Sequence, residues 1–105
     1  MKRSLLRPQA EGDLVARTRY YRSESGPALA ERFFNAALVS LRPIERMPGI
    51  GSLRIGELSD IPGLRDWPVQ GFPVRWLYFE TDTNLDVVRL IADTQDLLAI
   101  LRAAE

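Results

Sequence analysis

The segment LRDWPVQGFPVRWLYFETDTNLDVVRLIADTQDL, residues 64–97, decides the fold. Its runs at residues 74–79 and 85–91 are rich in β-branched and aromatic side chains, which favour strands. The short polar residues 81–84 between the two runs favour a turn. We therefore predict an antiparallel hairpin, which a preceding strand at residues 64–69 extends into a three-stranded meander.

Both faces of the strand at residues 74–79 are largely apolar, since Trp76 and Tyr78 alternate with Leu77 and Phe79. A strand that is apolar on both faces is either central in its sheet, or covered by helices on one face and by a partner chain on the other. The sequence alone leaves both interpretations open.

The chain before this segment predicts the layer that covers the sheet. Residues 2–7 predict a short edge strand, and residues 9–22 predict a first helix with acidic Glu11 and Asp13 in its first turn. An apolar stripe predicts a second helix at residues 27–42. Pro43 either ends this helix or kinks it, so that it continues to Met47.

A further strand is predicted at residues 53–58, and a last helix after Ile91, capped by Asp93 or Thr94. The predicted fold class is therefore α+β. An N-terminal helical hairpin packs on a three- or four-stranded, mainly antiparallel sheet, and a C-terminal helix follows. The length of 105 residues predicts a single domain, residues 1–105.

The composition excludes several kinds of chemistry. The sequence contains neither cysteine nor histidine, so it has no disulfide, no thiolate and none of the commonest metal ligands. We expect no metal and no cofactor. The longest apolar runs are far shorter than the roughly 18 residues of a membrane span, and the N-terminus does not resemble a signal peptide. We therefore expect a cytoplasmic protein that does not bind membranes.

The charges are unevenly distributed along a chain of net charge zero. Residues 1–54 contain ten basic and five acidic groups, a net charge of +5, whereas residues 55–105 contain four basic and nine acidic groups, a net charge of −5. Lys2 is the single lysine, and the other thirteen basic residues are arginines. This pattern indicates either a basic face for an acidic partner, or an arginine bias with ordinary solvated helix faces.

Short motifs follow one another along nearly the whole chain. They are Pro8-Gln9-Ala10-Glu11-Gly12-Asp13-Leu14, Ala30-Glu31-Arg32-Phe33, Ala37-Leu38, Pro62-Gly63-Leu64-Arg65, Phe72-Pro73 before Tyr78, and Val88-Arg89-Leu90 with Asp96-Leu97. Their order and spacing resemble the RelE/ParE toxin superfamily, and the ParE branch in particular.

This resemblance implies a ParE-like toxin of a type II toxin–antitoxin system. Such a toxin inhibits DNA gyrase by binding it, and a small ParD-like antitoxin neutralises it in a hetero-oligomer. The toxin is not expected to bind DNA directly without its antitoxin. The resemblance leaves two alternatives, a RelE-like ribosome-dependent mRNA endonuclease and an inactive paralogue that only binds an antitoxin.

The available side chains favour binding over RNA cleavage. Cleavage needs a proton acceptor, a proton donor and cations for the phosphate. The chain has no histidine and no tyrosine after Tyr78. Ala92 and Gln95 stand where ParE-like sequences often have histidine and arginine. We therefore predict no catalytic residue and no enzymatic activity, while the ribonuclease alternative stays open.

The candidate site residues fall into two groups, both inferred from the resemblance and the residue types. The predicted target-binding residues are Arg65, Trp67, Arg75 and Arg89. The predicted antitoxin-binding residues are Leu77, Phe79, Leu97, Leu98 and Leu101.

Each candidate also has a simpler structural interpretation. Arg65 could form an ion pair with Asp66 or Asp60, and Arg75 and Arg89 could each be paired with a carboxylate, because an unpaired charge in an apolar strand is costly. The tryptophans and leucines could belong to the core. Asp93 and Asp96 are interpreted as helix-capping residues.

Overall fold

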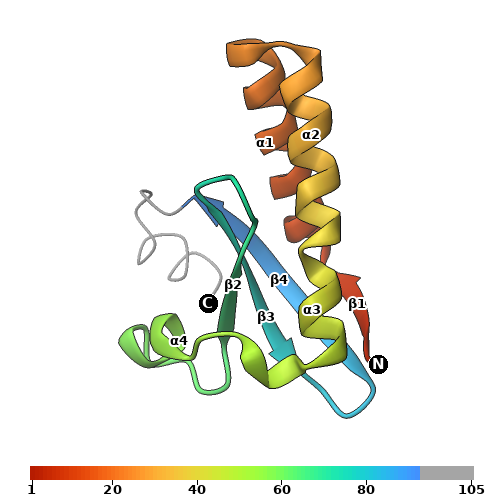
Figure 1. The fold of residues 1–105 in the computed structure, drawn as a ribbon. Coiled ribbons are helices and arrows are strands. Elements are labelled where there is room, and N and C mark those ends of the chain that lie inside the picture. Colours follow the sequence, from red (N-terminus) through yellow and green to blue (C-terminus); the bar gives the residue numbers. More distant parts are fainter. Residues whose placement is uncertain (93–105) are drawn as a thin grey trace.

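The computed structural model describes residues 1–92, in which a strand, a helical region and three further strands follow one another (Figure 1). The elements are β1 (Arg3–Leu6), α1 (Pro8–Ser25), α2 (Pro27–Val39), α3 (Leu41–Arg46), the 3-10 helix η1 (Pro48–Ile50), α4 (Arg54–Leu58), β2 (Arg65–Pro68), β3 (Val74–Glu80) and β4 (Asn84–Ala92). The predicted C-terminal helix, with its capping residues and leucines, lies outside the described residues.

The four strands form one sheet in the order β1-β4-β3-β2. Antiparallel pairing of β2 with β3 and of β3 with β4 confirms the predicted meander. β1 pairs parallel with β4 at the edge of the sheet, which confirms the predicted edge strand and the mainly antiparallel sheet. In the turn between β3 and β4, the Thr81 hydroxyl accepts a hydrogen bond from the Asn84 N–H at 3.0 Å.

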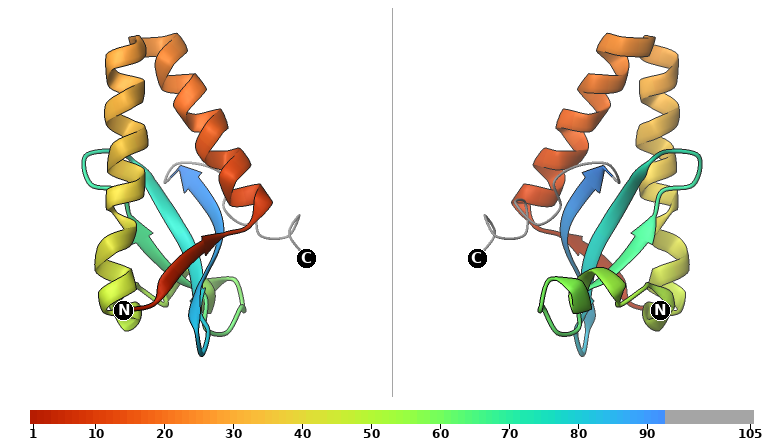
Figure 2. Two further views of the ribbon diagram at one scale, coloured as in Figure 1. Left: turned by 90° about the vertical axis from the view of Figure 1, so that its right-hand side faces the viewer. Right: turned by 90° about the vertical axis from the view of Figure 1, so that its left-hand side faces the viewer.

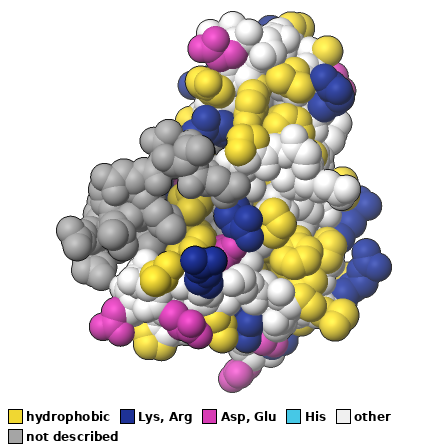
Figure 3. Space-filling view, turned by 60° about the vertical axis from the view of Figure 1, so that its left-hand side comes forward, with side chains coloured by type: hydrophobic (Ala, Val, Ile, Leu, Met, Phe, Trp, Pro, Cys, Tyr) yellow, Lys and Arg dark blue, Asp and Glu magenta, His cyan; other side chains and the backbone are white. Residues whose placement is uncertain are grey.

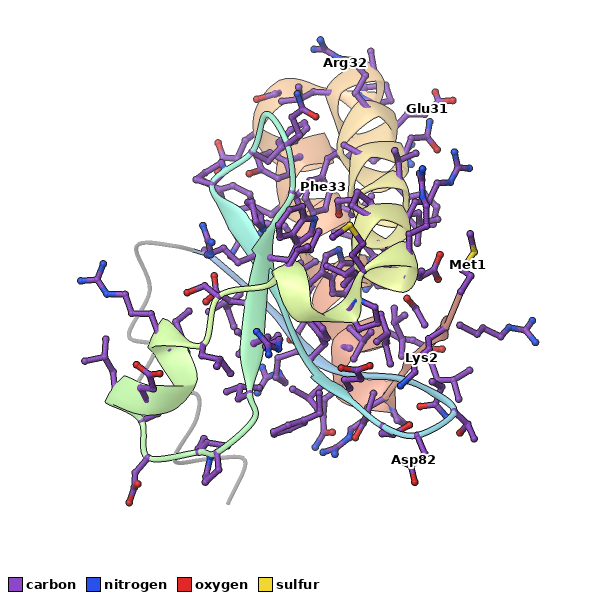
Figure 4. The ribbon with its side chains drawn as sticks, turned by 60° about the horizontal axis from the view of Figure 1, so that its bottom comes forward. Met1, Lys2, Glu31, Arg32, Phe33 and Asp82 are labelled. Carbon is purple, nitrogen blue, oxygen red and sulfur yellow. The ribbon has the colours of Figure 1, made fainter. Side chains whose placement is uncertain are left out.

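Helices α1 and α2 form the predicted hairpin and cover one face of the sheet, which we call the inner face (Figure 2). Gly26 joins the helices at φ 90° and ψ 171°, a conformation that is open almost only to glycine. Pro27 then begins α2, where a missing N–H costs nothing. The inner core includes Phe33, Trp76 and Tyr78, and Figure 4 shows Phe33 pointing from α2 into the protein.

The second helix ends earlier than predicted. α2 stops at Val39, and after Ser40 the chain continues as α3. This agrees with the predicted alternative in which the helix is interrupted and then continues toward Met47. The Ser40 hydroxyl donates to the Ala37 carbonyl at 2.7 Å, a local bond that competes with regular helix. Pro43 lies in the first turn of α3, where no intrahelical partner is needed.

A second apolar cluster lies on the opposite face of the sheet, which we call the outer face. It consists of buried Leu64, Leu77, Val88 and Ile91 with the partly buried Ile55, Ile61 and Phe79. β3 is therefore a central strand with buried apolar residues on both faces, as one of the two interpretations predicted.

The predicted strand at residues 53–58 is wrong, because residues 54–58 form helix α4. Alternation of Leu53 and Ile55 is compatible with a strand, but Gly56 packs against the turn that precedes β2. A Cβ atom at Gly56 would lie 2.6 Å from the Leu64 carbonyl oxygen and 2.7 Å from that of Ile61. This close contact leaves no room for a side chain at residue 56. Hydrogen bonds from the Glu57 N–H to the Leu53 carbonyl at 2.9 Å and from the Ser59 N–H to the Ile55 carbonyl at 3.0 Å close the helical turn.

Candidate functional site

Arg65 and Trp67 lie two residues apart on β2 and point to the same face of the sheet, since they pair with Tyr78 and Trp76 of β3. The structure thus brings these two predicted target-binding residues together. It separates them from Arg75 on β3 and from Arg89 on β4.

The Arg65 guanidinium binds backbone carbonyls and not a carboxylate. Its Nη1 donates to the Gly49 oxygen at 3.0 Å and to the Gly51 oxygen at 2.8 Å. The predicted partners Asp66 and Asp60 are therefore wrong. Neighbouring strand residues point to opposite faces, so Asp66 lies on the outer face, away from the Arg65 side chain.

Trp67 lies half-buried at a hollow of about 450 Å³ between β2 and the helices. We call this hollow, lined mainly by apolar atoms, the Trp67 hollow; its lining residues are Ala36, Val39, Ser40, Pro43, Trp67, Pro68 and Gln70. Trp76 is instead fully buried, and its Nε1 donates to the Ala37 carbonyl at 2.9 Å and to the Ser40 hydroxyl at 3.0 Å. The core interpretation of Trp76 is confirmed, whereas Trp67 both contacts the core and borders the surface.

Arg75 forms an ion pair on the outer face with Asp66, the residue between Arg65 and Trp67. The Asp66 residue is only 3% exposed, so its charge requires this cation. The Asp66 backbone also pairs with Ser52, which fixes β2 to the loop before α4. The ion-pair interpretation of Arg75 is confirmed.

Arg89 forms a bidentate ion pair with Asp13 of α1. Its Nε and Nη2 donate to the two carboxylate oxygens at 2.7 and 3.0 Å, and the hydrogen bond to Asp13 is the main cause that raises the pKa of Arg89. Asp13 also accepts the Leu90 N–H at 3.0 Å. The predicted pairing of Arg89 with a carboxylate is confirmed, but Asp13 is the sixth residue of α1 and not a residue of its first turn.

The predicted antitoxin-binding residues that are described lie on the outer face. Leu77 is fully buried, and Phe79 is half-buried in the same apolar cluster. The other three, Leu97, Leu98 and Leu101, lie outside the described residues. The outer face therefore combines an apolar cluster with the ion pair of Arg75 and Asp66.

Sequence reasoning missed the role of Tyr78, which holds the loop below the sheet. Its hydroxyl donates to the Pro48 carbonyl at 2.6 Å and accepts the Gly51 N–H at 3.1 Å. Burial is the main cause that raises the pKa of Tyr78 above its usual value of 10.0. The glycines on either side of Ile50 are the signal that could have indicated such a close backbone approach.

Basic side chains lie in the middle of the view in Figure 3, and another basic group lies beside a large hydrophobic group on its right-hand side.

Within residues 1–92, no three His, Cys, Asp or Glu side chains are placed to hold a metal ion. None of the described helices combines the length and apolarity that a membrane crossing requires.

The arrangement described above is an α+β domain in which a helical hairpin covers one face of a four-stranded mixed sheet. No family model and no curated protein matches the sequence. Among solved structures, the fold is similar to a chain of the chromosomal ParDE TA system from P. aeruginosa, with a TM-score of 0.75 and 19% sequence identity. The match covers 88% of this chain and 96% of that chain. The likeness supports a ParE-like fold.

Proposed function

We propose that this chain is the toxin of a type II toxin–antitoxin pair, that it inhibits DNA gyrase by binding it, and that a ParD-like antitoxin neutralises it. The observation that carries the proposal is the match of the fold, over 88% of this chain, to a chain of a ParDE toxin–antitoxin system. The ordered motifs of the sequence point to the same system. The proposed place of action is the cytoplasm, where gyrase works.

The contacts of the basic and phenolic side chains support binding over catalysis. Arg75 and Arg89 are engaged by Asp66 and Asp13, so their charges are already balanced within the fold. The Tyr78 hydroxyl is committed to two backbone partners, and its raised pKa makes it a poor proton acceptor at neutral pH. The endonuclease alternative would use Arg65 and Arg89 to bind phosphate, and Arg89 is one of these engaged groups.

We assign the two partners to different faces of the sheet. The target contacts the surface of Arg65 and Trp67, where a tryptophan borders an apolar hollow, as binding hot spots often do. The antitoxin contacts the outer face at Phe79, which is half-buried, beside the buried Leu77 of the same apolar cluster. In this proposal, Arg75 and Arg89 position the strands and do not contact the target themselves.

The test is a gyrase supercoiling assay with the purified chain, alone and with the small protein encoded beside its gene. We expect inhibition that the neighbouring protein relieves. Trp67→Ala should weaken inhibition about tenfold, whereas Leu58→Ala, at a 71% exposed residue of α4, should leave it unchanged.

The proposal fails if the folded chain arrests growth without inhibiting gyrase. Cleavage of ribosome-bound mRNA by the chain would then identify the endonuclease alternative. A chain that binds the neighbouring protein but neither arrests growth nor inhibits gyrase would be the inactive paralogue.

A further inference from the structure

The edge of β2 beside the Trp67 hollow is closed to strand addition. The Asp66 N–H donates to the Ser52 carbonyl at 2.9 Å, and the Ser52 N–H donates to the Asp66 carbonyl at 3.0 Å. Pro68, the last residue of β2, has no N–H. A peptide that extends a sheet needs a row of free backbone groups. A partner at this hollow must therefore bind through side chains.

One wall of the Trp67 hollow is a stripe that runs along α2 and continues on α3. Ala36, Val39 and Pro43 line the hollow at helical spacing, with Arg32 one turn before them and Arg46 one turn after. From Arg32 to Arg46 the stripe runs about 21 Å at 1.5 Å per residue. Val39 is 50% exposed although it is apolar. A stripe of this length matches the packing surface of another helix.

Basic side chains outnumber acidic ones beside this stripe. Arg32, Arg42 and Arg46 are exposed and form no ion pair with any residue in 1–92. Of the two glutamates on these helices, Glu45 uses its carboxylate to accept the Ser4 N–H at 3.1 Å. Figure 4 shows Glu31 and Arg32 leaving α2 in different directions. The surface thus offers apolar contacts between arginines that form no ion pair with the described part of the chain.

We propose that the Trp67 hollow binds an amphipathic helix whose apolar residues are flanked by Asp and Glu. The apolar side of such a helix would cover Val39, Pro43 and Trp67. Its carboxylates would meet the three arginines of α2 and α3, which gives the complementarity that steers and orients a partner. The inference deepens the proposed function and rests on it, because the surface is the one assigned to the target.

The test uses the full chain and two designed, fluorescein-labelled peptides. Each peptide has about 18 residues, enough to span the stripe as a helix, with leucines on one side. At the positions outside the leucine side, one peptide carries glutamates and the other, its twin, carries lysines. Fluorescence anisotropy should show the glutamate peptide binding about tenfold more tightly than the lysine twin, with the difference shrinking as ionic strength rises.

Charge reversal on the surface should reverse the preference. Arg42→Glu/Arg46→Glu should bind the lysine twin more tightly than the glutamate peptide. The matched control is Arg19→Glu/Arg54→Glu, which changes net charge equally at two exposed arginines of α1 and α4 and should keep the wild-type preference.

A second pair of variants tests the apolar contact with an uncharged polar residue. Val39→Asn should weaken binding of the glutamate peptide, whereas Val15→Asn, at a residue of α1 with similar exposure of 47%, should not. Equal affinity for both peptides, no binding, or equal effects of test and control variants would overturn the inference. Binding to vesicles of anionic lipid in place of the peptide would overturn it in favour of a membrane surface.

The peptide assay and the gyrase assay test the two proposals separately. Binding of the glutamate peptide by a chain that does not inhibit gyrase would remove the gyrase target and leave the acidic-helix site. Inhibition of gyrase by a chain that does not bind the peptide would remove the acidic-helix site alone.

Discussion

Tyr78→Phe should destabilise the protein through the loop that the Tyr78 hydroxyl holds. The substitution keeps the buried ring and removes the acceptor of the Gly51 N–H and the donor to the Pro48 carbonyl. Gly51 is buried, so its N–H would lose its partner without gaining water, which costs about 1–3 kcal/mol. At roughly 4–8 °C per kcal/mol for a domain of this size, a loss of about 2 kcal/mol lowers Tm by about 10 °C.

Thermal unfolding followed by circular dichroism measures this loss, with urea unfolding as a second measure of the free energy. The control is Tyr20→Phe, because Tyr20 is 50% exposed and its hydroxyl makes no hydrogen bond with residues 1–92. We expect Tyr20→Phe to match the wild type. Equal stability of Tyr78→Phe and the wild type would refute the reasoning.

A double-mutant cycle locates the effect at the contact with Gly51. A Cβ at Gly51 would contact the Tyr78 hydroxyl most closely and would lie 2.8 Å from Cε1 and 2.9 Å from Cζ of the ring. Gly51→Ala should therefore be strongly destabilising in the wild type and less so in Tyr78→Phe, with a coupling of about 1 kcal/mol. Equal costs in both backgrounds would show that the two residues do not interact as described.

The remaining predictions concern pH, an ion pair and a close backbone contact. Burial raises the pKa of Tyr78 above 10.0, so the unfolded chain loses the Tyr78 proton at a lower pH than the folded chain does. The free energy of unfolding should therefore fall as the pH rises beyond 10. A series of urea titrations at increasing pH should show a less steep fall for Tyr78→Phe. Asp13→Asn should cost about 1–3 kcal/mol in urea unfolding, since it removes the anion that pairs with Arg89, whereas Glu11→Gln on the same helix should cost almost nothing. Gly56→Ala should cost about 1–3 kcal/mol by forcing α4 away from the Leu64 carbonyl, and unchanged stability would contradict the packing described for that helix.

The sheet and the helical hairpin could be predicted because their signals are local. Strand-forming residues alternate on both sides of a polar turn, and Pro27 marks the start of α2 where the structure has it. The segment at residues 53–58 lacks such a signal. Its helix packs a glycine against a turn five to eight residues later, and local alternation does not carry that information.

The residue types of the candidate site could be predicted from the sequence, but the groups to which these residues bind could not. An arginine in an apolar strand predicts a carboxylate partner, yet Asp13 lies 76 positions before Arg89, and only the packing of α1 beside β4 brings them together. For Arg65, the nearest acidic residue was the wrong choice, because Asp66 points to the other face. The carbonyl groups that Arg65 binds belong to the loop at residues 48–51, and Tyr78 holds this loop in place.

Polar groups from outside the sheet close its edges, and this closure determines how partners can be recognised. Glu45 accepts the Lys2 N–H at 2.9 Å and the Ser4 N–H at 3.1 Å along β1. Asp13 accepts the Leu90 N–H at 3.0 Å where β4 extends beyond β1, and Ser52 pairs with Asp66 on β2. A partner that added a strand at these positions would first have to break these bonds. Recognition within residues 1–92 is therefore left to side-chain surfaces, and the Trp67 hollow joins an exposed apolar stripe to arginines that form no ion pair with these residues.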